Sequence, residues 1–208
     1  MKQLGQAMKA IYGSFVGEKE DMHLRSTDVP RTFESAVAFA SGFFPNETTF
    51  NISFRPKTVD PLIYFFNHCP LEANITLGIS RSDFPLERWL YSVVPELTSI
   101  PPPAHGFSLQ GRTDIIKCMY CNGRATQTNS TLETIFAASN ANFRNIYYDS
   151  PYISPRLHRM RAGTLLLEIK QHLLNRIFHK HTPSFNLYSA HDLTLVSLLS
   201  AMSIRETK

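Results

Sequence analysis

The feature that most constrains the fold is a pair of strand-to-helix junctions, one near each end of the chain. Towards the C-terminus, a β-prone run passes through Tyr188–Asp192 (Tyr-Ser-Ala-His-Asp) into an apolar helical pattern over Leu195–Met202. Towards the N-terminus, Arg25 closes a strand-like stretch, and Ser26–Asp28 offer caps for a helix whose first turn holds Pro30. In a parallel sheet both junctions open on one edge, where open α/β sheets place their chemistry.

The residue types at these junctions suit an anionic ligand. A helix that begins next to His191 and Asp192 supplies free N–H groups and partial positive charge, and Arg25 supplies a guanidinium. The residues alone leave a second interpretation open. Asp is common in a first helical turn, and Arg25 could be a surface arginine in a loop.

Residues 1–45 read as helix, strand, helix, and residues 184–202 as strand, helix. Between them, a long amphipathic helix is predicted over 156–180. The expected apolar face of the helix after Arg25 consists of Phe33, Ala36, Val37, Ala40 and Phe44. The expected apolar face of the long helix consists of Leu166, Ile169, Leu173 and Ile177.

The middle of the chain has a different pattern. Short β-prone pieces occur at 50–54 and 62–66, and residues 67–150 alternate short helical patterns with proline-rich connections. We therefore expect a three-layer α/β/α fold with a mostly parallel sheet. Its core would comprise 1–66 and 151–208, and an inserted, mainly helical cap would comprise 67–150.

Composition excludes little. The formal net charge is +4 with dispersed Lys and Arg, so nothing indicates nucleic-acid binding. No apolar run reaches the roughly 18 residues of a membrane span. The N-terminal MKQLGQAMKA lacks the hydrophobic region of a signal peptide.

Taken together, these motifs resemble the histidine acid phosphatases, the second branch of the histidine phosphatase superfamily. Leu24–Thr32 contains Arg-Ser-Thr-Asp-x-x-Arg-Thr, and Tyr188–Leu195 contains Tyr-Ser-Ala-His-Asp-x-Thr-Leu. The helix at Met1–Tyr12 and the segment Arg161–Leu166 are similar to the family's helices before these two strands. The order of the four segments fits, and the resemblance is most specific over 1–45 and 156–202.

The resemblance implies a metal-free and cofactor-free hydrolysis of phosphate monoesters through a phosphohistidine. It makes Arg25 and His191 phosphate-binding and catalytic residues, and Asp192 the proton donor to the leaving alcohol. The family's nucleophile lies in Arg-His-Gly-x-Arg-x-Pro, and this motif does not occur in the chain. We therefore expect a fragment that is incomplete at both ends.

The compartment is predicted from the family and from sequons. Members are largely secreted, lysosomal or surface-bound, and four N-x-Ser/Thr sequons occur here, at Asn46, Asn51, Asn74 and Asn129. A secretory parent glycoprotein is expected, although the chain shows no leader.

The three cysteines are Cys69, Cys118 and Cys121. The spacing of Cys118 and Cys121 invites a metal or redox interpretation, but no second Cys/His pair at suitable spacing supports it. The resemblance instead implies disulfide partners for the regions around Cys69 and Cys118 beyond the His-Asp motif.

Two interpretations of the function stay open. The first is an enzyme that acts on phosphate monoesters, represented by part of its chain. The second is a non-catalytic phosphate-binding relative or a truncated gene product. A phytase-like or lysophospholipid-directed member is a further, weaker alternative, because the sequence does not identify the substrate.

Overall fold

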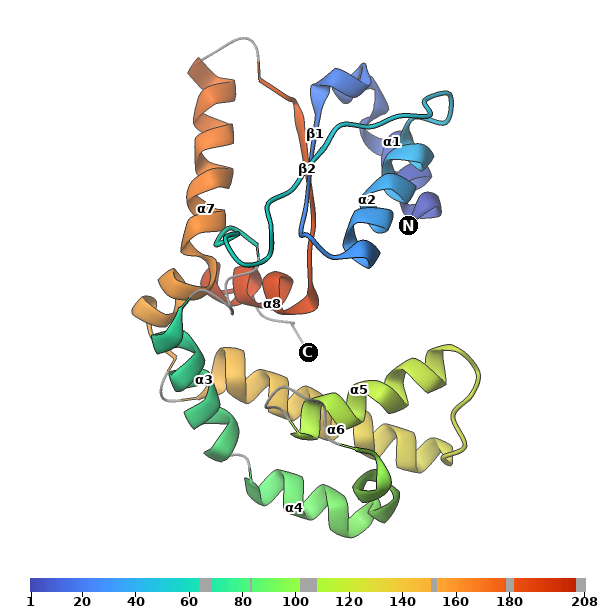
Figure 1. The fold of residues 1–208 in the computed structure, drawn as a ribbon, viewed down its shortest axis with the longest axis vertical. Helices are drawn as coiled ribbons and strands as arrows, with labels where there is room; N and C mark the ends of the chain where they lie inside the picture. Colours follow the sequence, from blue (N-terminus) through green and yellow to red (C-terminus); the bar gives the residue numbers. More distant parts are fainter. Residues whose placement is uncertain (64–68, 83, 102–107, 151–152, 179–181, 205–208) are drawn as a thin grey trace. The chain divides into compact units, whose positions relative to one another are not determined.

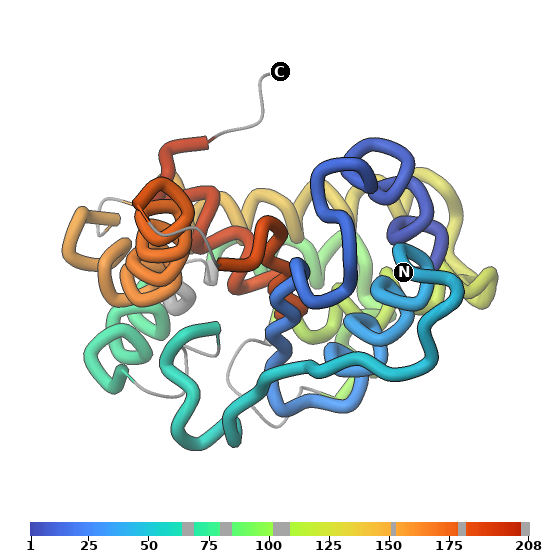
Figure 2. The backbone as a smooth tube through the Cα atoms, turned by 90° about the horizontal axis from the view of Figure 1, so that it is seen from above, coloured from blue at the N-terminus to red at the C-terminus, as the bar shows by residue number. Residues whose placement is uncertain are grey.

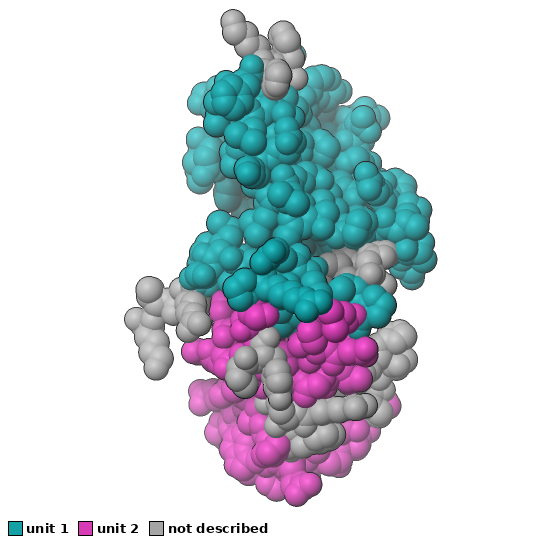
Figure 3. Space-filling view, turned by 90° about the vertical axis from the view of Figure 1, so that its left-hand side faces the viewer, with its two compact units in different colours: residues 1–70, 155–208 teal, residues 71–154 magenta. Residues whose placement is uncertain are grey.

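The computed structural model describes residues 1–63, 69–82, 84–101, 108–150, 153–178 and 182–204. These form two compact units, one of Met1–Pro70 with Pro155–Lys208 and the other of Leu71–Ser154 (Figure 3). The first unit contains a parallel sheet with helices on both faces. The second is helical in its described residues.

The sheet of the first unit is built from β1 (Met22–Ser26), β2 (Ile52–Ser53) and β3 (Phe185–Ser189) in the order β2-β1-β3. All pairings are parallel, and β1 matches β3 from Met22 opposite Phe185 to Ser26 opposite Ser189. This register aligns the two strand ends. The α/β class predicted from the sequence is confirmed.

Helices α1 (Lys2–Val16) and α2 (Pro30–Phe43) lie on one side of the sheet, and α7 (Pro155–Phe178) lies on the other (Figures 1 and 2). Helix α8 (Asp192–Ala201) follows β3 and packs against α7. The apolar core between the sheet and the first two helices includes Val16, Met22, Leu24, Phe39 and Phe43. This three-layer arrangement fixes which strand residues meet which helices.

Backbones of α1 and α2 are in direct contact. A Cβ atom added to Gly5 would lie 2.1 Å from the Phe39 carbonyl oxygen, and one added to Gly42 would lie 2.1 Å from that of Lys2. Only glycine permits this approach, so the two glycines allow α1 and α2 to pack closely against each other.

Several local predictions were wrong for tertiary reasons. In α2 the buried apolar residues are Ala36, Phe39, Ala40 and Phe43, whereas Phe33 and Val37 are exposed. The buried side chains pack into one cluster with Val16, Met22 and Leu24, and Gly42 of the same helix contacts the backbone of α1. The predicted side-chain caps are also absent, because Val29 is the N-cap, although Pro30 does begin the helix.

The predicted face of α7 was wrong in its second half. Leu165 is buried, but Leu173 and Ile177 are 61% and 71% exposed. The strand expected over 50–54 shortens to Ile52–Ser53. Leu62 and Ile63 form a buried turn instead of a strand, and 64–66 lie outside the described residues.

The second unit contains α3 (Pro70–Ser82, which begins at the boundary), α4 (Phe84–Val93), α5 (Ser108–Cys121) and α6 (Asn129–Arg144). Short 3-10 turns at Lys19–Asp21 and Pro95–Ser99 and a π turn at Asn145–Asp149 complete the described elements. The main described apolar cluster of the unit includes Leu90, Val94, Leu97, Leu109, Ile116, Leu132, Ile135 and Ala138.

Candidate functional site

The two strand-to-helix junctions meet at the carboxyl edge of the sheet. Because β1 and β3 are parallel neighbours in register, Arg25 pairs with Tyr188, and His191 follows two residues after β3 ends. A backbone hydrogen bond from Thr27 N to Ser189 O, 3.2 Å long, continues the contact beyond the strands. The structure therefore brings Arg25, His191 and Asp192 to one edge.

His191 is the N-cap residue of α8 and is half-buried. Its Nε2 lies 3.1 Å from Thr27 Oγ1, and its Nδ1 lies 3.4 Å from Arg31 Nη2. A guanidinium can only donate, so Nδ1 is the acceptor and Nε2 carries the proton. Burial lowers the pKa of His191, with Arg31 adding to the effect and Asp192 opposing it. The imidazole is thus held neutral in this tautomer at neutral pH.

A chain of hydrogen-bonded hydroxyl groups orients Thr27, the side chain that contacts His191 Nε2. Thr32 Oγ1 donates to the Val29 carbonyl at 2.8 Å, which leaves it to accept from Thr27 Oγ1 at 2.7 Å. Thr27 can then accept the proton of His191 Nε2. Because Thr27 and Thr32 are buried, this relay orients the imidazole firmly.

Arg25 is 5% exposed and forms an ion pair within the first unit. Its Nη2 donates to Asp60 Oδ1 at 2.8 Å, and its Nη1 donates to the Ser26 carbonyl at 3.2 Å. Asp60 is fully buried, and its Oδ1 also accepts from Leu62 N. Its Oδ2 has no hydrogen-bond partner among the described residues. Arg25 is therefore a fixed charge rather than a mobile surface side chain.

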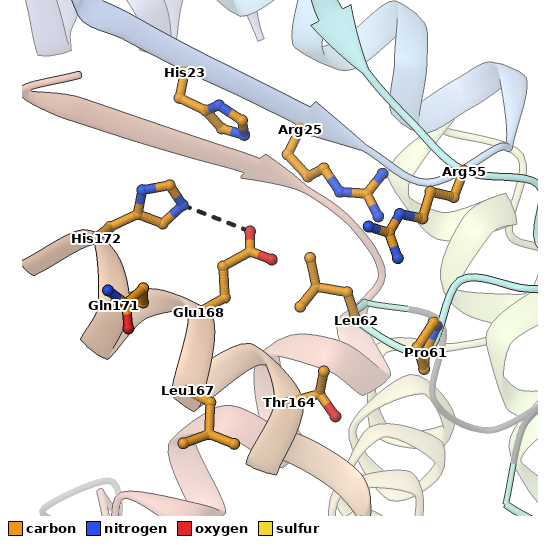
Figure 4. A pocket seen from close by; sticks show the side chains of 10 residues that line it. All are labelled: His23, Arg25, Arg55, Pro61, Leu62, Thr164, Leu167, Glu168, Gln171 and His172. Carbon is orange, nitrogen blue, oxygen red and sulfur yellow. Dashed lines mark ion pairs between the residues drawn. The ribbon is translucent and has the colours of Figure 1, made fainter. Parts of the chain in front are cut away.

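The same guanidinium lines a pocket between β1 and α7 (Figure 4). Arg55 and the polar residues His23, Glu168 and His172 share this lining. His191 is not among the described lining residues, so Arg25 and His191 share an edge of the sheet but are not shown to share this pocket.

Asp192 occupies the first turn of α8 and is exposed. Its Oδ1 accepts from the following backbone N–H of Leu193 at 2.9 Å. A carboxylate at this position benefits from the positive end of the helix, and it stays accessible to a ligand at the edge.

Sequence reasoning missed three contributors. Arg31 and Thr27 lay within the quoted Arg-Ser-Thr-Asp-x-x-Arg-Thr motif but received no role, and their contacts with His191 give them one. Asp60 carried no signal, because a single Asp in a loop does not reveal a partner 35 residues away.

The other predicted positions have simple surroundings. The four sequon asparagines, Asn46, Asn51, Asn74 and Asn129, are all exposed, and their glycosylation stays a prediction. The three cysteines are free thiols, with Cys118 and Cys121 exposed on α5. No helix in the described part of the chain combines the length and apolarity that crossing a bilayer demands.

The chain is thus an α/β protein that carries arginine and histidine side chains at the carboxyl ends of its parallel strands. The sequence model of the histidine phosphatase superfamily (branch 2) matches residues 1–67. Prostatic acid phosphatase of Bos taurus is 25% identical over 97% of this chain and 58% of its own length. Lysosomal acid phosphatase of Homo sapiens is 24% identical over 97% of this chain and 52% of its own. The chain is therefore similar in sequence to histidine acid phosphatases over nearly its whole length.

A solved structure supports the fold. The phytase of Klebsiella sp ASR1 superposes with a TM-score of 0.63 at 14% identity, over 97% of this chain and 60% of the phytase chain. At that identity the likeness bears on the fold alone. The chain spans little more than half the length of the curated relatives named above.

Proposed function

We propose that this chain carries the phosphate-recognising and proton-donating part of an acid phosphatase-like site. The observation that supports it most is the in-register pairing of β1 with β3, which gives Arg25 and the His191–Asp192 pair one common edge. Phosphate monoesters are the substrate class, and the parent protein is expected in the secretory or lysosomal route of its relatives.

The roles follow from the groups available. The Nε2–H of neutral His191 can turn from Thr27 to a phosphoryl oxygen, and Arg31 beside it adds a guanidinium. Arg25 contributes positive potential that Asp60 partly neutralises. Asp192, at the accessible start of α8, is placed to give a proton to a leaving alkoxide when it is protonated.

Nucleophilic catalysis is the step these residues do not provide. Residues 1–208 contain no Arg-His-Gly-x-Arg-x-Pro, and the proposal gives His191 a hydrogen-bonding role. The 208-residue chain should therefore bind inorganic phosphate but hydrolyse para-nitrophenyl phosphate barely above background. Non-catalytic phosphate binding is the second candidate function. Because residues 1–208 lack Arg-His-Gly-x-Arg-x-Pro, we favour this function for the 208-residue chain when it is tested alone.

Calorimetric titration with inorganic phosphate tests the binding. Arg31→Ala and His191→Ala should each weaken phosphate about tenfold or more, since hydrogen bonds to a charged group contribute about 1.5–3 kcal/mol. Arg144→Ala is the matched control, because Arg144 is an exposed arginine in the second unit that pairs with Asp149. Equal phosphate affinity in all four proteins would refute the site.

The hydrolysis assay tests the mechanism separately. Strong turnover of para-nitrophenyl phosphate that disappears in His191→Ala would identify His191 as a nucleophile and overturn its assigned role.

We also propose that the chain divides into an α/β core and an inserted helical cap that selects the substrate. The two compact units support this division.

A further inference from the structure

A second group of titratable side chains lies away from His191, in the pocket between β1 and α7. One nitrogen of His23, one carboxylate oxygen of Glu168 and one nitrogen of His172 all lie within 4.8 Å of one another. Figure 4 shows the three side chains converging, with His172 Nε2 and Glu168 Oε1 separated by 3.7 Å. The proposed phosphate chemistry uses none of the three.

The secondary structure explains why they converge. Glu168 and His172 are four residues apart on α7 and therefore occupy one face of the helix. His23 is the second residue of β1, and its neighbours Met22 and Leu24 are directed into the core with α1 and α2. Alternation along the strand therefore directs His23 to the α7 side.

The ligand set is typical of a transition-metal site. Two imidazoles and one carboxylate match three-ligand zinc sites, which leave the fourth position open. Nitrogen donors also favour Zn²⁺, Co²⁺ or Ni²⁺ over Mg²⁺ and Ca²⁺. Tetrahedral ligands about 2.0–2.2 Å from a metal lie about 3.3–3.6 Å apart. The Glu168–His172 pair is already near that separation.

The surroundings support the ligands. Tyr188 donates its hydroxyl to Glu168 Oε1 at 2.9 Å, an outer hydrogen bond of the kind that orients ligating carboxylates. Arg25 is a buried cation in the same pocket lining, and Asp60 pairs with it. Arg55 is the other cationic residue of the lining, and it is exposed.

We propose that His23, Glu168 and His172 bind one divalent transition-metal ion of the Zn²⁺ class, with its fourth coordination position facing the pocket. The sequence did not predict this site, because His23 and the two α7 residues are far apart along the chain. The proposal does not depend on phosphate binding at the His191 edge.

A Co²⁺ titration followed by visible absorption, with Zn²⁺ as competitor, tests the proposal on the full 208-residue chain without phosphate. The background carries Cys69→Ser, Cys118→Ser and Cys121→Ser, which removes thiolates that could bind either metal. We expect one Co²⁺ per chain, an intense tetrahedral-type spectrum and displacement by Zn²⁺.

Two ligand variants and two controls make the test specific. Glu168→Gln keeps the side-chain shape, and His172→Ala removes a ligand. Each should weaken the metal by more than the roughly 10–100-fold typical of losing an outer hydrogen bond, the loss expected for Tyr188→Phe. His158→Ala, on the same helix, and Gln171→Ala, which lines the pocket without a ligand role, should leave the affinity unchanged.

A second readout protects against misfolded variants. Zn²⁺ should raise the thermal unfolding midpoint of the background protein and of both controls but not of Glu168→Gln. Wild-type-like metal affinity in Glu168→Gln and His172→Ala, or no stoichiometric binding by the background protein, would overturn the proposal.

Discussion

The two faces of the small sheet differ sharply although the same two strands build both. On the side of α1 and α2, the apolar residues Met22, Leu24, Phe185 and Leu187 pack into a closed core. On the side of α7, His23 and Arg25 line an open pocket with Glu168 and His172. A parallel sheet covered by helices on both faces usually carries apolar residues on both. The departure places ionisable side chains of β1 on the α7 face, where a smaller apolar cluster that includes Leu62, Ile63 and Leu165 supplies the packing.

The largest expected effect concerns the buried ion pair on the polar face. Asp60→Ala leaves the guanidinium of Arg25 buried without its carboxylate, and removal of one partner of such a pair costs about 3–5 kcal/mol. Urea unfolding followed by far-UV circular dichroism measures the loss.

Two further variants sharpen that result. Replacing both partners, Arg25→Met with Asp60→Leu, should recover most of the stability, because apolar pairs of similar volume are tolerated there. Asp149→Ala, in an exposed pair with Arg144, should change stability by about 0–1 kcal/mol. If Asp60→Ala costs no more than Asp149→Ala, the polar face is not held by this pair.

The next effect compares the helix layers on the two faces. Gly42→Ala would place a methyl group 2.1 Å from the Lys2 carbonyl oxygen, so α1 and α2 must separate, at about 1–3 kcal/mol or more. Gly163→Ala in α7 meets nothing closer than 3.7 Å and should stabilise that helix by about 0.5–1 kcal/mol. The same urea assay gives both signs, and a harmless Gly42→Ala would show that the first two helices are loosely packed.

Acidification should destabilise the first unit through His158 and His191. Burial lowers the pKa of both His158 and His191 from 6.5, so the unfolded chain takes up protons at a higher pH than the folded chain. Their contribution to stability is complete above pH 6.5 and is lost as the pH falls through the lower folded pKa values. The unfolding midpoint, measured with a chelator present, should therefore be lower at pH 5.5 than at pH 7.5. His191→Gln should make the difference between the two midpoints smaller. A midpoint independent of pH would contradict this assignment.

The sequence predicted what local patterns control. The junctions at Arg25 and His191, the α/β class and the helix start at Pro30 all follow from residues close together in the chain. The orientation of α2 did not, since its apolar residues cover more than one face and the contact of Gly42 with α1 decides between them. Asp60 likewise depends on a long-range partner.

The polar face was the least predictable part for the same reason. His23 lies in β1 and Glu168 in α7, and each side chain alone has an ordinary explanation as a solvated polar residue. Only the parallel register and the packing of α7 on the sheet bring them within reach of each other. Arg25 of the Arg-Ser-Thr-Asp-x-x-Arg-Thr motif lines this pocket, but the motif gives no indication of the other polar residues in the lining.

The smallest expected effect tests whether Tyr188 anchors α7 to the polar face. Tyr188→Phe removes the hydroxyl that donates to Glu168, and this bond is only partly buried, so we expect a loss of about 1 kcal/mol, the value of a typical single hydrogen bond. Burial and Glu168 raise the pKa of Tyr188 above its ordinary value of 10.0. Above pH 10 the unfolded chain therefore ionises first, so stability should fall as the pH rises. Tyr120→Phe, at an exposed position of α5, is the control and should leave stability unchanged. An ultraviolet titration of the folded protein counts the tyrosines that ionise only at high pH. Tyr188→Phe should have one fewer of these tyrosines than the wild type. An unchanged count would mean that the contact of Tyr188 with α7 is not formed.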